Sequence, residues 1–190
     1  MNQNLVVKKE QTSAQKLVLV GMFAAVLAVL SQLSIPMPTG VPVTLQTFAV
    51  ALTGYVLGWK LGTVAVLVYI LLGAAGAPVF ANFSGGPGAL IGMSGGFLWG
   101  FIVMVFLCGF GAEQKNKLVL SGMSFAGLAV CHLLGIWQFM AVTEMKFIPA
   151  ALAASVPYLA KDAVSLIAAY LVAKTIRKAL NAAGIGGSLR

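Results

Sequence analysis

Long apolar segments follow one another along the chain, and only short polar clusters separate them. A helix needs roughly 20 apolar residues, at 1.5 Å each, to cross the hydrocarbon core of a bilayer. The pattern predicts six such spans, at about 16–35, 43–58, 61–77, 94–112, 118–140 and 152–176. These spans leave no stretch for a separate soluble domain. We therefore expect one all-α integral membrane domain over residues 1–190.

The first apolar segment has one feature of a secretory signal peptide, because lysines precede it. Its apolar run starts at Leu17 and is followed by Ser31-Gln32-Leu33-Ser34-Ile35. A signal peptide has a shorter apolar core. We interpret the segment as a retained helix.

The composition supports the membrane assignment, since 60% of the residues are hydrophobic, 8% are charged and the mean hydropathy is +0.99. A water-soluble domain of this length needs a far more polar surface. Both cysteines, Cys108 and Cys131, lie inside apolar segments. Packed thiols are therefore a better interpretation than a structural disulfide.

The net charge of +8 might suggest a nucleic-acid partner, but the basic residues occupy alternate loops. Such loops face the cytoplasm by the positive-inside rule. We expect cytoplasmic N- and C-termini, contact with anionic lipid headgroups and no nucleic-acid partner. Of the twelve basic residues, ten fall on this side, the exceptions being Lys146 and Lys161; the ten are Lys8, Lys9, Lys16, Lys60, Lys115, Lys117, Lys174, Arg177, Lys178 and Arg190.

The outer connections at 35–46 and 77–92 carry no charge and mix proline and glycine with apolar side chains. Irregular backbone at membrane depth is tolerated where it is buried in protein or lines a cavity. The connections are either tight apolar turns or a lid over a pocket. A pocket would use their neutral polar groups, which orient a ligand without the desolvation cost of a charge. These groups are Thr44, Gln46, Asn82 and Ser84.

Asp162 is the only aspartate, and it lies just inside the outer end of the last span. If that helix begins near Pro157, Asp162 lies ~8 Å below its start. An intramembrane carboxylate indicates a functional site, although an ion pair with a neighbouring helix is the alternative. Adjacent helical residues point about 100° apart, so we expect no direct pair with Lys161. Lys161 either contacts a ligand or extends to the membrane surface.

His132 follows Cys131 in the fifth span, but two potential ligands from one stretch do not make a zinc site. We expect a contact between helices and no metal, and a ligand contact of His132 is the alternative. Trp99 and Trp137 are typical of membrane interfaces or helix packing, and lining of the pocket is the alternative.

Motifs for catalysis are missing from the sequence. It contains no phosphate-binding G-x-x-x-x-G-K-[ST] loop and no H-E-x-x-H. One aspartate, one histidine and three glutamates (Glu10, Glu113 and Glu144) offer little material for paired acid–base groups. We expect no catalytic residues and no cofactor, and an intramembrane enzyme is the weaker alternative.

Three motifs in the same order carry a resemblance to a known family: 41–48 (VPVTLQTF), 76–97 with its Gly85-Gly86 and Gly95-Gly96 pairs, and Pro157-Tyr158 followed by Asp162. Together they resemble the BioY family, the biotin-specific S components of energy-coupling factor (ECF) transporters. The resemblance implies a six-helix S component in a prokaryotic cell membrane that binds biotin at its outer face. It also implies docking on a transmembrane coupling subunit that carries two ATPase subunits. An S component for another vitamin is the alternative.

The resemblance also suggests roles for individual residues. Asp162 and Asn82 would bind the ureido ring of biotin, and Phe80 and Tyr158 would enclose the sulfur ring. The carboxylate tail would reach Lys161, Gln46, Thr44 or the segment of Ser84, Gly85 and Gly86. The chain departs from the family where it has Met93-Ser94 in place of Pro-Thr, and Ser165 in place of a lysine. S components dock through an A-x-x-x-A pattern on the first helix, which Ala24 and Ala28 supply.

Overall fold

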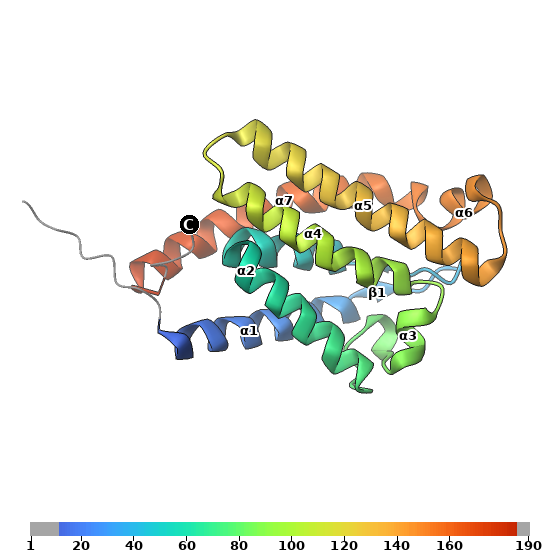
Figure 1. Cartoon of the computed structure of the whole chain (residues 1–190), viewed down its shortest axis with the longest axis horizontal. Coiled ribbons are helices and arrows are strands. Elements are labelled where there is room, and N and C mark those ends of the chain that lie inside the picture. Colours follow the sequence, from blue (N-terminus) through green and yellow to red (C-terminus); the bar gives the residue numbers. More distant parts are fainter. Residues whose placement is uncertain (1–11, 186–190) are drawn as a thin grey trace, which may run out of the picture.

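The computed structural model describes residues 12–185 and shows a bundle of long helices (Figure 1). Five helices in this part of the chain are long and apolar enough to cross a membrane, so the chain is an all-α membrane protein. They are α1 (Ser13–Gln32), α2 (Gln46–Ala74), α4 (Gly95–Glu113), α5 (Lys117–Thr143) and α7 (Val156–Ala182). The shorter elements are β1 (Ser34–Ile35), β2 (Val43–Thr44), η1 (Ala81–Phe83), α3 (Pro87–Ile91) and α6 (Phe147–Ala154).

The second and third predicted spans correspond to the single helix α2, which is not straight. Gly58 has φ 76° and ψ 179°, outside the helical region. A Cβ atom on Gly62 would lie 3.3 Å from the Cα of Gly54, whereas residues eight apart in a straight helix are separated by about 12 Å. The chain therefore reverses at Gly58, and 46–57 packs against 59–74 as two limbs. Residues 12–185 thus contain five long helices where the sequence predicts six spans.

Glycines let α4 pack closely against its neighbours α2 and α5. A Cβ atom on Gly109 would lie 2.5 Å from the backbone nitrogen of Trp59, and one on Gly100 would lie 2.6 Å from the Cα of Cys131. Small residues at such contacts are the usual means of packing helices in membranes. Cys108 and Cys131 are free and buried, which confirms the prediction of packed thiols.

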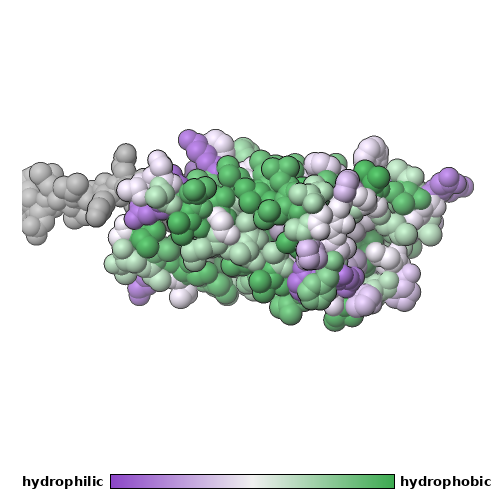
Figure 2. Space-filling model, turned by 90° about the horizontal axis from the view of Figure 1, so that it is seen from below, coloured by the Kyte–Doolittle hydropathy of each residue, from purple (hydrophilic) through white to green (hydrophobic). Residues whose placement is uncertain are grey.

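The two ends of the bundle differ in character. The start of α1, the end of α7 and the turn between α4 and α5 lie at one end, while α3, α6 and the β1–β2 hairpin lie at the other (Figure 1). A broad band of hydrophobic side chains covers the surface between hydrophilic residues near the ends (Figure 2). Seven of the basic residues on the predicted cytoplasmic side belong to the first end, and Lys8, Lys9 and Arg190 lie outside the described residues.

The uncharged connections at the second end are compact. β1 and β2 pair antiparallel, with Ser34 opposite Thr44 and Ile35 opposite Val43. The other connection folds back on α2, since the backbone N–H of Gly86 donates to the carbonyl of Gly73 at 2.7 Å. Both connections thus pack on the helices and close the bundle at this end.

Candidate ligand-binding site

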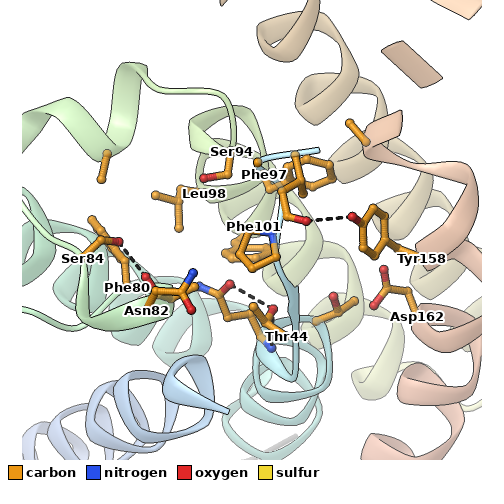
Figure 3. Close-up of a pocket in the computed structure, with 18 of the residues that line it drawn as sticks. Thr44, Phe80, Asn82, Ser84, Ser94, Phe97, Leu98, Phe101, Tyr158 and Asp162 are labelled. Carbon is orange, nitrogen blue, oxygen red and sulfur yellow. Dashed lines mark hydrogen bonds between the residues drawn. The ribbon is translucent and has the colours of Figure 1, made fainter. Parts of the chain in front are cut away.

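A cavity of about 240 Å³ lies at the end of the bundle where the two uncharged connections meet (Figure 3). Eight of the ten residues that the sequence suggested for ligand binding line it: Thr44, Gln46, Phe80, Asn82, Ser84, Tyr158, Lys161 and Asp162. Gly85 and Gly86 do not line it, so their predicted position was wrong. Gly85 packs on the carbonyl of Ala77, and the N–H of Gly86 is already bound to Gly73, so both glycines shape the connection instead.

Asp162 lies at the centre of a buried polar cluster on one side of the cavity. Its side chain is held by α5, because Oδ2 is 3.2 Å from Nε2 of His132. The other ring nitrogen of His132, Nδ1, is 2.8 Å from Oγ of Ser155, just before α7. The expected contact of His132 between helices is therefore present. The histidine also lines the cavity.

Lys161 pairs directly with Asp162, contrary to the expectation from helix geometry. Although their Cα–Cβ bonds diverge, the four-carbon stem of the lysine is long enough to curl back toward its neighbour. Its Nζ also donates to the carbonyl of Thr44 at 2.8 Å, so Lys161 links α7 to β2 rather than extending to the surface.

Both oxygens of the Asp162 carboxylate have a basic partner within residues 12–185. Oδ1 is fully buried and pairs with the Lys161 ammonium, whereas Oδ2 lies beside His132. A carboxylate can accept more than one hydrogen bond at each oxygen, so Asp162 keeps acceptor capacity for a ligand that donates an N–H or O–H.

Asn82 faces the cavity from the side opposite Asp162 (Figure 3). It has φ 57°, in the left-handed region, which asparagine tolerates better than most residues. Its Oδ1 accepts a hydrogen bond from Ser34 Oγ at 2.7 Å, whereas no residue in the described chain accepts from its Nδ2. Asn82 thus offers an amide donor to a ligand.

Aromatic and aliphatic side chains form the walls between these two polar groups. Phe80 is buried and packs edge-on against Tyr69, with ring centroids 5.4 Å apart. At the start of α4, the N-cap Ser94 and the helical residues Phe97, Leu98 and Phe101 also line the cavity. Sequence reasoning missed these α4 residues, although their spacing of i, i+3, i+4 and i+7 marks one helix face. Thr47 was missed as well.

Two predicted polar residues have structural partners in the cavity wall. Gln46 accepts a hydrogen bond from Thr44 Oγ1 at 3.0 Å and donates to the hydroxyl of Tyr69 at 2.9 Å. The Tyr158 hydroxyl donates to the carbonyl of Val41 at 2.7 Å and thereby holds the 36–42 connection beside the cavity. Both residues therefore help to fix the shape of the site.

The predicted docking pair on α1 is not on a free surface. Ala24 is only 3% exposed within the hydrophobic core, and Ala28 is partly buried against that core. The sequence motif does not specify which face of α1 is exposed. The packing of α1 on α2 determines that face. The exposed face instead carries Gly21, Met22, Ala25 and Val29.

Comparison with known proteins gives a consistent result. A profile of the BioY family matches residues 2–182. The biotin transporter BioY of Thermotoga maritima is 42% identical over 169 residues, which cover 86% of this chain and 96% of the relative. The probable biotin transporter BioY of Pyrococcus horikoshii is 37% identical over 164 residues, covering 86% and 97%.

The fold also has a counterpart among solved structures. The crystal structure of the S-component for biotin from an ECF-type ABC transporter matches with a TM-score of 0.79 and 22% identity, covering 89% of this chain and 95% of that one. At this identity the likeness shows the shared fold. The chain therefore belongs to the BioY family, because the family profile matches residues 2–182 and the Thermotoga relative is 42% identical.

Proposed function

We propose that this chain binds biotin in the cavity beside Asp162 and acts as the substrate-specific S component of an ECF-type transporter. Membership in the BioY family and relatives named as biotin transporters support this function. The observation that carries it is the buried Asp162 carboxylate, which is held by Lys161 and His132 and lines a cavity of about 240 Å³.

The chemistry of biotin matches the polar groups of the cavity. Its ureido ring has two N–H donors and a carbonyl, so one N–H would donate to Asp162 and the carbonyl would accept from Asn82 Nδ2. The thioether ring would lie against the apolar walls, among them Phe80 and Tyr158. The Lys161 ammonium would hold the Asp162 carboxylate in place for its hydrogen bond with the ureido N–H.

The decisive test is Asp162→Asn, measured by calorimetric titration with biotin. Loss of a charged hydrogen bond costs about 1.5–3 kcal/mol, so we expect affinity to fall by roughly tenfold to a hundredfold. Glu144→Gln is the matched control, because Glu144 is exposed at the end of α5 and does not line the cavity. Unchanged affinity in a folded Asp162→Asn protein would falsify the role of this carboxylate. A thermal-shift screen of other vitamins tests the substrate itself.

We also propose six membrane crossings, with the two limbs of α2 counted separately, in one domain in the cell membrane of a prokaryote. The reversal at Gly58 supports this count. The end that holds the turn between α4 and α5 would face the cytoplasm, because basic residues gather there. Both termini would then be cytoplasmic, and the biotin cavity would open to the outside.

For energy coupling, we propose that a transmembrane subunit bearing two ATPases docks on the exposed face of α1. Gly21 and Ala25 are small, exposed and four residues apart, which suits close approach of another helix. Replacing both with Trp should abolish ATP-driven uptake and leave biotin binding intact. Gly122 and Ala126 form an equally spaced, exposed pair on α5, so the same replacement there is the control and should leave uptake unchanged. Normal uptake by the α1 variant would contradict this docking surface.

A further inference from the structure

A second cavity, of about 180 Å³, lies at the opposite end of the bundle from the biotin site. It is enclosed by the first limb of α2, the end of α4, the start of α5 and the last turns of α7. Ten residues line it: Tyr55, Ala112, Gln114, Lys115, Lys117, Leu120, Tyr170, Ala173, Lys174 and Arg177.

The lining of this cavity is strongly cationic. Four of its residues are basic, and none is acidic. The nearest glutamate in sequence, Glu113, turns toward the reversal of α2, since its Oε1 would lie 2.5 Å from a Cβ atom on Gly58. Within residues 12–185, Lys115, Lys117 and Lys174 form no salt bridge. The three lysines therefore bring positive charge to the cavity without a salt bridge to residues 12–185.

The start of α5 adds to this positive potential. A helix N-terminus carries partial positive charge, which acidic side chains normally stabilise. α5 begins at Lys117 and has no acidic residue in its first turn, and Lys115 lies just before it. Cations in this position are electrostatically unfavourable unless an anion is nearby.

The floor of the cavity is buried and rigid, which distinguishes it from a patch of surface lysines. Tyr55 is 3% exposed, donates a hydrogen bond to Ser124 Oγ at 2.7 Å, and packs edge-on against Tyr170. The Arg177 guanidinium donates to the carbonyl of Ala112 at 3.4 Å and so ties α7 to the end of α4. An anionic group would thus enter a formed recess.

Large exposed apolar side chains are close in sequence to the basic lining residues. Leu118 is 81% exposed directly after Lys117, and Leu171 is 59% exposed one turn before Lys174. A ligand that lies here would meet cations at its head and apolar surface along the rest of its length. This combination matches a phospholipid more closely than a small soluble anion.

We propose that this recess binds the phosphate group of an anionic phospholipid from the adjacent leaflet, with an acyl chain along Leu118 or Leu171. The lysines neutralise the phosphate, and the N-terminus of α5 adds to its stabilisation. Inorganic phosphate shares the same anionic chemistry, so the test separates these two sources.

The experiment uses the purified full chain in neutral detergent, with phosphatidylglycerol, phosphatidylcholine or inorganic phosphate added. Lipid retention is measured by native mass spectrometry, and stability by thermal shift. We expect phosphatidylglycerol alone to remain bound and to raise the Tm. The combined variant Lys115→Gln, Lys117→Gln, Lys174→Gln should lower its affinity at least about tenfold, since each lysine near an anionic surface contributes roughly fivefold.

The matched control is Lys16→Gln, Lys60→Gln, Lys178→Gln, which removes the same charge from the same end without touching the cavity. It should retain phosphatidylglycerol within about twofold, because charges outside the recess are screened in solution. An equal loss in the control would mean general charge attraction and would overturn the proposal. Equal binding of phosphatidylcholine, or stabilisation by inorganic phosphate that depends on the same lysines, would overturn the lipid assignment.

Biotin titration of both triple variants checks their folding. If the cavity triple variant does not fold, the single changes Lys115→Gln and Lys174→Gln replace it, and each should weaken lipid binding by roughly fivefold. Equal lipid binding by wild type and a folded single variant would count against the recess.

Discussion

The wall of the proposed biotin cavity depends on the absence of a side chain at Gly73. A Cβ atom on Gly73 would overlap the ring of Phe80, and that ring is buried against Tyr69 and lines the cavity. A methyl group at position 73 would therefore displace the Phe80 ring and change the cavity wall.

We accordingly predict that Gly73→Ala weakens biotin binding by about tenfold or more, since overpacking typically costs about 1–3 kcal/mol. Calorimetry measures the Kd, and Phe80→Leu added to Gly73→Ala should restore part of the affinity. Gly122→Ala is the control, because a Cβ atom on Gly122 meets nothing within 4 Å. Wild-type affinity in Gly73→Ala would show that Phe80 does not form the wall that contacts biotin.

Rare residue types made part of the site predictable at the residue scale. Asp162 is the only aspartate in an apolar chain, and Asn82 lies in an uncharged connection, so both were identified from sequence. Phe97 and Phe101 were not, because phenylalanine on a membrane helix is equally suited to lipid, core or cavity. The pairing of Lys161 with Asp162 depends on the path of one flexible stem, which helix geometry alone does not determine.

Among the elements, the end of α1 holds one wall of the cavity. Gln32 Nε2 donates to the carbonyls of Phe80 at 3.1 Å and Pro78 at 3.3 Å, while its Oε1 accepts from the backbone N–H of Phe83 at 2.9 Å. Ser31 Oγ donates to the carbonyl of Val79. These bonds fix segment 78–83, which carries Phe80 and Asn82.

Gln32→Ala should release this segment and weaken biotin binding by roughly fivefold to tenfold, since each lost hydrogen bond contributes about 1 kcal/mol. Hydrogen exchange of residues 78–86 should become faster in the same variant. Gln15→Ala changes the other end of α1, where Gln15 caps the helix, and should leave biotin affinity unchanged. Unaltered exchange in Gln32→Ala would contradict the anchoring role.

The bounds of the elements were more predictable than their arrangement. The predicted spans at 94–112 and 118–140 differ from α4 and α5 by at most three residues at each end, because apolar length and polar breaks define membrane helices directly. The rotation of α1 was not predictable, so Ala24 was placed on the wrong face. That rotation depends on contacts with α2, which the pattern within one helix does not encode.

For the whole molecule, the proposed topology makes a prediction about accessibility. Cysteines introduced at Lys60, Lys115 and Lys146 should react differently with a membrane-impermeant maleimide applied to intact cells. Lys146→Cys should be labelled from outside, whereas Lys60→Cys and Lys115→Cys should react only after permeabilisation. The native Cys108 and Cys131 are buried, so the parent protein provides a low background. Labelling of Lys60→Cys from outside would rule out a reversal of α2 on the cytoplasmic side.

The hydrogen bonds from Ser31 and Gln32 couple the orientation of α1 to the cavity wall. One face of this helix is anchored to the wall that carries Phe80 and Asn82, and its other face exposes Met22 and Val29 at the surface. If α1 tilts, segment 78–83 must move with it, or the hydrogen bonds from Ser31 and Gln32 must break. A partner subunit that binds the exposed face of α1 would therefore alter the cavity wall and weaken ligand binding without contacting the ligand.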